Sequence, residues 1–284
     1  MKKLLILVAD GMLGQYLQQV FGEKYEVINW IRTDLDITDR EAVLEKVSKL
    51  HPDIIINAAA YNAVDAAEEV DAYEIAKAVN GRGPEYLAQA ANAVGARFLH
   101  FSTDYVFKGD ATEPYTEDSV PDPQSNYARS KRIGEEGVLA TAGNNYVART
   151  CRLYGVAGES PDSKSSFVNV MLQLATDRDS LDIVDAELAS PTYTYDLAKQ
   201  AKVLLEGDYE PGMYHMTNEG ACTWYEFATE IFKMKNIDIT TNPVGPETFP
   251  RPAARPEYSE LRNTKLPAMR HWKEALADYL ENIE

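Results

Sequence analysis

The residues best suited to do chemistry are a tyrosine and a lysine that are one helical turn apart. Tyr127 and Lys131 are separated by four positions, so on a helix their side chains lie on one face. A cation beside a phenol stabilises the phenolate and lowers its pKa, which lets a tyrosine exchange a proton near neutral pH. Residues 121–126, which precede the pair, form a turn that would start such a helix. The pair predicts a proton donor, although this spacing alone is common by chance.

Polar and small side chains follow two predicted strands upstream of this pair. The apolar run 97–101 ends in Ser-Thr-Asp-Tyr, and the hydroxyl of Thr103 could hydrogen-bond a substrate carbonyl. Ligands of open α/β sheets bind beyond the carboxyl ends of the strands. Another strand ends in small residues that would let a cofactor lie close, namely Ala58, Ala59 and Ala60. We therefore expect these strand ends and the Tyr-Lys pair to form one site.

Two glycines follow the first apolar run, which covers residues 4–9. Gly11 and Gly14 are three positions apart. Glycines at a strand-to-helix turn let the backbone approach a pyrophosphate, and the helix N-terminus adds N–H donors and a partial positive charge. The full fingerprint would carry a third glycine where Val8 stands, so the pair also fits a plain turn. The candidate dinucleotide contacts here are Gly11, Met12, Leu13 and Gly14.

The second predicted strand lacks the terminal carboxylate that bonds an NAD ribose. Arg32 follows instead, and it could receive a 2′-phosphate, which favours NADPH while NADH stays possible. The alternative is that Arg32 is a solvated loop residue. Asp36, next to Ile37, is a candidate contact for the adenine. The same stretch also reads as the start of a helix, with Thr38 or Asp39 as its N-cap.

Alternating elements must position these residues. The strand-like runs cover residues 4–9, 27–31, 53–60, 97–102 and 146–153, and the helix-like segments cover 14–21, 40–50, 72–94 and 127–139. This alternation indicates an α/β protein with a Rossmann-like, doubly wound parallel sheet. Beyond about residue 155 the pattern loosens, with helices expected at 167–175, 196–206, 223–232 and 272–283. We expect a dinucleotide-binding domain over 1–155. A smaller, partly interleaved α/β substrate-binding region would cover 156–284, with segments that return to the first domain.

Composition excludes several classes of function. The chain has 284 residues and a formal net charge of −17, which repels phosphate backbones, so no nucleic-acid partner is expected. The N-terminal apolar run ends at Asp10, and no stretch approaches the roughly 20 apolar residues of a membrane helix. Cys151 and Cys222 have neither disulfide-framework nor metal-site spacing, and the four histidines are scattered. We expect a cytoplasmic protein without a metal.

Together these residues resemble the dTDP-4-dehydrorhamnose reductases, within the extended short-chain dehydrogenase/reductase superfamily. The resemblance runs from residue 3 to about residue 280. Its most specific parts are residues 102–107, Ser-Thr-Asp-Tyr-Val-Phe, and residues 251–256, Arg-Pro-Ala-Ala-Arg-Pro. Further matches are Asn57 to Tyr61 with Asp65 and Glu68, Asn80, Arg149-Thr150, Ser190-Pro191-Thr192, Asp196-Leu197-Ala198, Trp224 with Phe227, and Ser259.

The resemblance implies a catalytic role for three residues. Thr103 would hold the C4 carbonyl oxygen of a nucleotide-linked 4-keto-6-deoxysugar, and Tyr127 would deliver a proton to it. Lys131 would tune Tyr127 and bond the nicotinamide ribose. A hydride from NADPH would then reduce dTDP-4-dehydro-L-rhamnose to dTDP-L-rhamnose. The partner expected is therefore the nucleotide sugar, and the protein would be a monomer or a homodimer.

The resemblance also implies binding residues, although the chain departs from the family pattern in places. Asn80 would line the cofactor site together with Tyr127 and Lys131. The substrate would contact Asp104, Tyr105, Arg152 and Arg255, with Arg255 on the diphosphate unless it is a surface residue of a proline-rich loop. The departures are Val8 in place of a glycine, Arg152 in place of a tryptophan that packs on the sugar, Ala186-Glu187 in place of Asp-Gln, and the longer loop 155–166.

Two other functions fit the same fold. One is a non-catalytic, NADP-binding regulatory subunit, because the regulatory subunit of methionine adenosyltransferase resembles the same family. The other is a sugar-nucleotide dehydratase or epimerase. Dehydratases follow the threonine with Asp-Glu, whereas here Thr103 is followed by Asp104 and Tyr105, so the second carboxylate is missing. A related reductase with a different nucleotide-sugar substrate also stays open.

Overall fold

A parallel six-stranded sheet forms the centre of the protein in a computed structural model that describes residues 1–159 and 165–283. Every neighbouring pair of strands in it is parallel. This confirms the expected Rossmann-like α/β class. Across the sheet the strands are β2 (Glu26–Trp30), β1 (Lys3–Leu7), β3 (Ile54–Asn57), β4 (Arg97–Thr103), β5 (Asn144–Thr150) and β9 (Gly212–His215).

The central strands are apolar on both faces because helices cover both faces. Successive side chains of β1 alternate between two cores. Leu4 and Ile6 face one core, and Leu5 and Leu7 face the other, all nearly inaccessible to solvent. The strand register places the ends of β1 and β3 side by side, since Leu7 pairs with Asn57. The segments after these strands therefore meet at one edge of the sheet.

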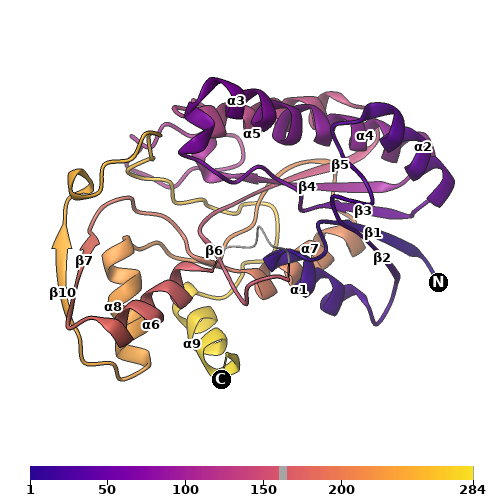
Figure 1. Cartoon of the computed structure of the whole chain (residues 1–284). Coiled ribbons are helices and arrows are strands. Elements are labelled where there is room, and N and C mark those ends of the chain that lie inside the picture. The colour runs from indigo at the N-terminus through magenta and orange to yellow at the C-terminus, as the bar shows by residue number, and fades with distance from the viewer. Residues whose placement is uncertain (160–164, 284) are drawn as a thin grey trace.

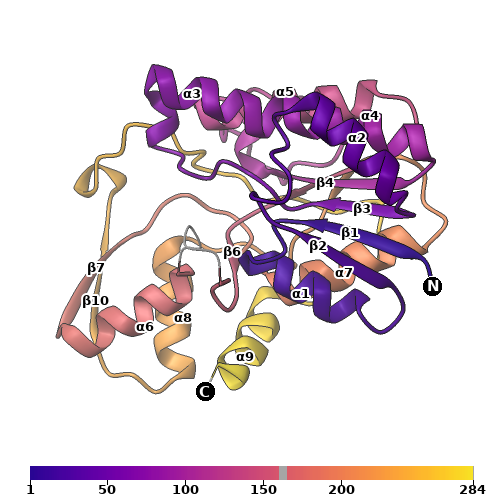
Figure 2. The same cartoon turned by 45° about the vertical axis from the view of Figure 1, so that its right-hand side comes forward.

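The helices form a layer on each side of the sheet (Figures 1 and 2). On one side lie α2 (Arg40–Leu50), α3 (Val70–Ala76), α4 (Gly83–Val94) and α5 (Asn126–Ala140). On the other side α1 (Met12–Phe21) packs against α7 (Thr194–Glu206). Both α7 and β9 come from the second half of the chain, so that half contributes to the large sheet and its cover.

Two predicted elements are interrupted in the structure. The helix expected over 72–94 is split by a π-helical turn over Lys77–Arg82 that turns Asn80 inward. The strand expected over 146–153 stops at Thr150, because Arg152 has a left-handed φ of 43°, and β6 (Leu153–Tyr154) follows. Strand β9 was not expected, since its four residues, which begin at the glycine of a Pro-Gly pair, are too few to show an alternating apolar pattern.

The smaller region packs three predicted helices around an aromatic core. These are α6 (Phe167–Asp177), α8 (Trp224–Met234) and α9 (Trp272–Asn282). Helix α8 begins at a capping box between Thr223 and Glu226, which satisfies two backbone donors at its N-terminus. Two short ladders complete the region: β7 (Ser180–Val184) with β10 (Thr240–Val244), and β6 with β8 (Thr192–Tyr193). Short 3₁₀ turns lie at Ala66–Glu68, Asp104–Val106 and Pro246–Thr248.

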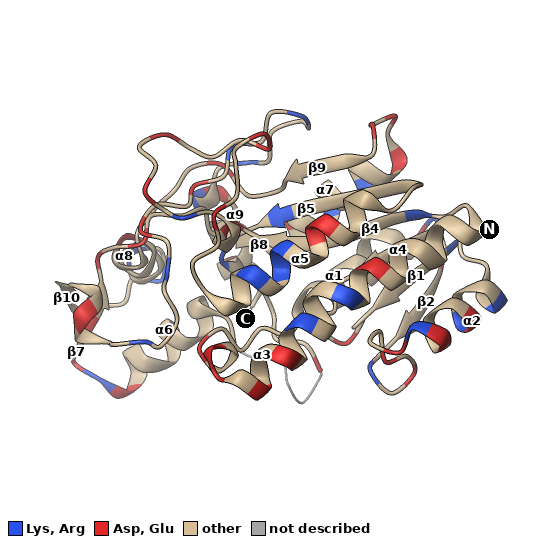
Figure 3. Cartoon of the chain, turned by 90° about the horizontal axis from the view of Figure 1, so that it is seen from above, with Lys and Arg blue, Asp and Glu red and all other residues tan. Residues whose placement is uncertain are grey.

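Charged residues lie mostly on helices and loops, while most of the length of the sheet strands is uncharged (Figure 3). Within residues 1–159 and 165–283, no helix is long and apolar enough to cross a membrane. Over the same residues, no group of three or more His, Cys, Asp or Glu side chains could hold a metal ion. Cys151 and Cys222 are both buried free thiols.

Candidate active site

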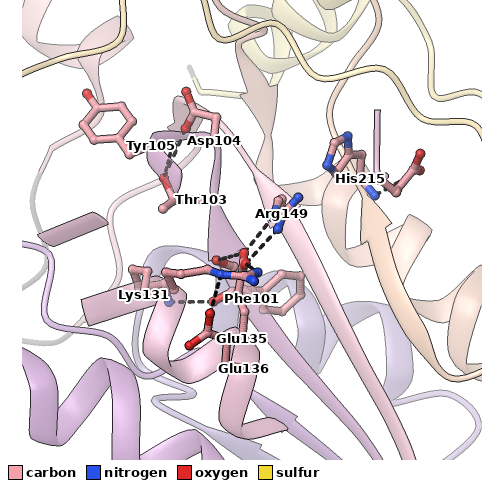
Figure 4. Close-up of polar contacts among 12 residues, drawn as sticks. Phe101, Thr103, Asp104, Tyr105, Lys131, Glu135, Glu136, Arg149 and His215 are labelled. Carbon is pink, nitrogen blue, oxygen red and sulfur yellow. Dashed lines mark hydrogen bonds and ion pairs between the residues drawn. The ribbon is translucent and has the colours of Figure 1, made fainter. Parts of the chain in front are cut away.

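Helix α5 holds both residues of the Tyr-Lys pair against the sheet. Ser125 caps its N-terminus by accepting a hydrogen bond from the Ala128 N–H over 3.3 Å, as the preceding turn predicts. Tyr127 and Lys131 are both buried. The Lys131 Nζ donates to the Phe101 carbonyl oxygen of β4 over 2.6 Å (Figure 4). An ammonium group has three N–H donors, so two remain for other acceptors.

The carboxyl end of β4 brings Thr103 and Tyr127 together. The Thr103 hydroxyl is close enough to Tyr127 to act on its pKa by hydrogen bonding. Tyr105 packs edge-on against the Tyr127 ring, with the ring centroids 6.0 Å apart. Thr103 Oγ1 also donates to Asp104 Oδ1 over 3.1 Å and accepts from the Tyr105 N–H over 3.2 Å. The structure thus places Thr103 and Tyr127 beside the buried Asp104 carboxylate at the end of β4, while Lys131 bonds Phe101 of the same strand.

The pKa values in this site differ from the simple expectation. The pKa of Tyr127 is raised, first by burial and then by the nearby Asp104 charge, with the Thr103 hydrogen bond acting against the rise. The Lys131 ammonium bonds Phe101, and the tuning of Tyr127 by Lys131 stays a prediction. A raised pKa keeps the phenol protonated, as a proton donor requires. Burial lowers the pKa of Lys131 to about 8, and the charge of Glu135 opposes this effect.

A buried ion pair anchors α5 to the sheet one turn beyond Lys131. Glu135 accepts from Arg149 Nε and Nη2, each over 2.7 Å (Figure 4), and from the Ser102 hydroxyl over 2.7 Å. Burial opposes ionisation of Glu135, but the hydrogen bonds from Arg149, Ser102 and Arg132 outweigh it and lower the pKa of this carboxyl. Because Ser102 and Arg149 belong to β4 and β5, this pair fixes the catalytic helix relative to both strands.

The turn after β1 has the backbone shape of a dinucleotide site. A Cβ on Gly14 would lie 2.4 Å from the Val8 carbonyl oxygen, so only glycine lets α1 start this close to the strand. Val8 itself adopts a left-handed φ of 59°, the conformation that a glycine would take there without strain. Gly11 is the N-cap of α1, and Met12 and Leu13 follow it in the first turn, whose N–H groups lack acceptors within the helix. The turn therefore fits a pyrophosphate.

The residues after β2 are compatible with both roles considered for them, namely contacts to a cofactor and the start of helix α2. Arg32 is exposed in the turn that follows the strand, which leaves it accessible to a ligand. Asp36 accepts from both the N–H and the hydroxyl of Thr38, over 2.9 and 2.7 Å, whereas Asp39 caps α2 by accepting from the Ala42 N–H over 3.1 Å. The expected N-cap at Asp39 is confirmed. Ile37 is buried.

The Asn80 side chain hydrogen-bonds the backbone of the segment that follows β3. Its side chain is fully buried, and its amide donates to the Tyr61 carbonyl and to Ser130 Oγ over 3.1 and 2.9 Å. Its Oδ1 accepts from the Tyr61 N–H over 2.8 Å. Asn80 thus fixes Tyr61, which directly follows Ala58, Ala59 and Ala60. Its predicted contact with the cofactor stays a prediction.

The predicted substrate residues are largely engaged within the protein. The Arg152 guanidinium stacks on Trp224 at 4.0 Å and donates to the Cys222 and Glu187 carbonyls. Arg255 forms a two-pronged ion pair with Asp65, over 2.8 and 2.7 Å. Arg152 thus connects the chain after β5 to the start of α8, and Arg255 connects the C-terminal loop to the segment after β3. Their roles toward a substrate stay predictions.

Sequence reasoning assigned no role to several residues that shape the site. Glu135 and Arg149 form the ion pair that anchors α5, and Ser259 and Cys151 donate to Asp104 over 2.6 and 3.1 Å. Asp104 is 2% exposed and accepts from Thr103, and its expected contact with substrate stays a prediction. The position of Arg149 inside the apolar run 146–153 is a local signal for a buried ion pair.

Comparison with known proteins agrees with this geometry. A family model described as the RmlD substrate binding domain matches residues 1–284. A dTDP-4-dehydrorhamnose reductase from Streptomyces griseus is 39% identical over 286 residues, which cover 96% of this chain and 91% of that protein. The crystal structure of a dTDP-4-dehydrorhamnose reductase from Clostridium acetobutylicum has a TM-score of 0.90 at 42% identity and covers 98% of each chain. One from Bacillus anthracis, in complex with NADP, has a TM-score of 0.92 at 35% identity and covers 99% of each chain. The chain therefore belongs to the dTDP-4-dehydrorhamnose reductase family of Rossmann-fold oxidoreductases.

Proposed function

We propose that this protein uses NADPH to reduce the C4 ketone of a dTDP-linked 4-keto-6-deoxysugar, with dTDP-4-dehydro-L-rhamnose as substrate and dTDP-L-rhamnose as product. The observation that carries the proposal is the junction of Thr103, Tyr127 and Lys131 at the end of β4, beside a turn shaped for a pyrophosphate. The relative from Bacillus anthracis, which was solved with NADP, supports the choice of cofactor.

Tyr127, Lys131 and Thr103 have separate roles in the proposed reaction. NADPH, when bound, supplies the hydride for C4. Tyr127 is the proton donor to the C4 oxygen, and its raised pKa keeps the proton on the phenol until the oxygen gains charge. Lys131, a buried cation, would hold the nicotinamide ribose of the bound cofactor. Thr103 lies at the same strand end, where its hydroxyl is held by Asp104 and in turn positions the Tyr127 phenol toward the ketone, so that the reacting groups are held in position.

The proposal is tested with purified protein and a panel of keto-sugars. NADPH absorbance should fall when dTDP-4-dehydro-L-rhamnose is added, and the product should co-elute with dTDP-L-rhamnose. The panel includes dTDP-4-keto-6-deoxy-D-glucose, because a faster reaction with that sugar would keep the reaction class and replace the substrate. Absence of turnover with every keto-sugar, in protein shown to be folded, would refute a reductase and favour the regulatory subunit. That alternative predicts a stable complex with a second protein.

The exposed position of Arg32 predicts a preference for NADPH. Arg32→Ala should raise the dissociation constant for NADPH about tenfold and leave that for NADH unchanged, because one charge-assisted hydrogen bond to the 2′-phosphate is lost. Titration calorimetry with both cofactors measures this. Arg40→Ala is the matched control, since Arg40 is an exposed arginine of α2 that bonds Gln89. Equal losses for NADPH and NADH would contradict the assignment of Arg32.

The lowered pKa of Lys131 predicts an alkaline limb in the pH profile. Its pKa of about 8 means that the ammonium loses its proton as the pH rises through that value, so kcat/KM should fall above about pH 8. Tyr127 does not cause this limb, because its own pKa is raised. Lys131→Arg keeps the cation and should show no limb in that range, whatever its rate. A wild-type profile that stays flat to about pH 10 would disprove the role of the cation.

A further inference from the structure

Asp104 sits at a junction where three distant parts of the chain meet. Its Oδ1 accepts from Thr103 Oγ1 over 3.1 Å at the end of β4. Its Oδ2 accepts from Ser259 Oγ over 2.6 Å and from Cys151 Sγ over 3.1 Å. All four side chains are less than a tenth exposed. The carboxylate is therefore enclosed by donors, and none of these bonds is needed to form a helix or a strand.

The bond to Asp104 decides where Thr103 directs its proton. A hydroxyl has one proton and two lone pairs. The proton of Thr103 faces Asp104, and one lone pair accepts from the Tyr105 N–H over 3.2 Å. The hydroxyl also acts on the nearby Tyr127 phenol. A carboxylate that moved, or that became a donor by taking up a proton, would turn the Thr103 hydroxyl.

We propose that Ser259 and Cys151 are positioning residues, which hold the Asp104 carboxylate so that it fixes the Thr103 hydroxyl beside Tyr127. This inference rests on the proposed function, in which Thr103 positions Tyr127 and Tyr127 acts on the ketone. Ser259 is the stronger of the two, because a short O–H···O⁻ bond is charge-assisted, whereas a thiol is a weak donor.

The segment that carries Ser259 is docked by its own contacts. The Ser259 N–H donates to the Leu188 carbonyl over 2.8 Å. Four residues earlier in the chain, Arg255 pairs with Asp65 on the Rossmann side. Ser259 therefore links this C-terminal loop to Asp104 and, through Asp104, to Thr103.

Loss of the Ser259 hydroxyl should lower kcat about tenfold and change KM and the NADPH dissociation constant by less than about twofold. Ser259→Ala tests this, and Ser259→Thr, which keeps a hydroxyl, should recover most of the rate. Ser190→Ala is the control, because Ser190 is equally buried and its Oγ has no hydrogen-bond partner among the described residues. Equal losses in the Ser259→Ala and Ser190→Ala proteins would overturn the proposal.

Coupling to Thr103 separates positioning from a general structural effect. In a Thr103→Ala background, Ser259→Ala should cause no further loss of kcat, since the group that it positions is gone. Additive losses would overturn the proposal.

The acid limb of the kcat profile should also shift to higher pH in Ser259→Ala. Burial raises the pKa of Asp104, and the hydrogen bonds from Ser259, Cys151 and Thr103 lower it. The other groups that face Asp104 are Arg152, Tyr105 and Tyr127.

A measurement without turnover keeps the inference separate from the proposed function. Protein labelled with carboxyl-¹³C aspartate, with Asp104→Asn used to assign the signal, reports the Asp104 titration directly by NMR. We expect the midpoint at higher pH in Ser259→Ala than in the wild type. Unchanged midpoints overturn the inference, whether or not the protein reduces any keto-sugar. Wild-type protein that is inactive on every keto-sugar overturns the proposed function alone.

Discussion

Tyr127→Phe is expected to lower kcat for the keto-sugar by about 10²–10⁴-fold, the usual contribution of a general acid. The substitution removes only the phenolic oxygen, and the ring keeps its edge-on contact with Tyr105. Because the packing of the ring is kept, NADPH affinity and the unfolding temperature should change little. Stopped-flow single-turnover rates and NADPH titration measure the two quantities separately.

The control for this variant is another tyrosine of the same apolar cluster. Tyr73 of α3 is packed in the cluster that contains Tyr127, and Tyr73→Phe should retain full turnover. A Tyr127→Phe protein that turns over like the wild type would contradict the assignment of Tyr127 as the proton donor. A protein that lost turnover together with NADPH binding would point to a damaged fold instead, so both measurements are made on the same preparation.

The second large effect is on stability, at the ion pair behind the site. Glu135→Gln should lower the free energy of unfolding by about 3–5 kcal/mol, because Arg149 would stay buried without its countercharge. Arg149 is 1% exposed and Glu135 is fully buried. Urea unfolding at neutral pH measures the change. The wild type should itself lose this contribution as the pH falls through the lowered pKa of Glu135.

The neighbouring residue provides the control for this prediction. The Glu136 side chain is 60% exposed and pairs with Arg132 over 2.9 Å. Surface pairs contribute at most about 1 kcal/mol, so Glu136→Gln should unfold almost like the wild type. Similar losses in both variants would mean that the buried pair adds nothing beyond an ordinary surface contact.

Local pattern was enough to predict the elements that carry the catalytic pair. Alternating apolar runs and helical segments predicted the parallel sheet, and the turn before Tyr127 predicted the start of α5 at the right place. The period of a strand or a helix is contained in its own residues, so these elements needed no tertiary information. The short strand β9 and the ladder of β7 with β10 were missed because their pairing partners are remote.

The polar network of the site could not be predicted for the same reason. Ser259 bonds Asp104 across 155 positions, and Arg255 bonds Asp65 across 190. Nothing in the local sequence marks one remote carboxylate as the partner rather than another. The inward turn of Asn80 likewise depends on a π-helical turn, which interrupts the regular helix period.

The most direct test of the account follows the hydride. Protein is given dTDP-4-dehydro-L-rhamnose with NADPH deuterated at nicotinamide C4, in separate reactions for the two faces, and the product sugar is analysed by NMR. The account predicts that one of the two labelled cofactors delivers deuterium to C4 of the sugar, and that Tyr127→Phe slows this transfer by about 10²–10⁴-fold. Product with no deuterium at C4 from either cofactor, or equal transfer by Tyr127→Phe, would contradict it.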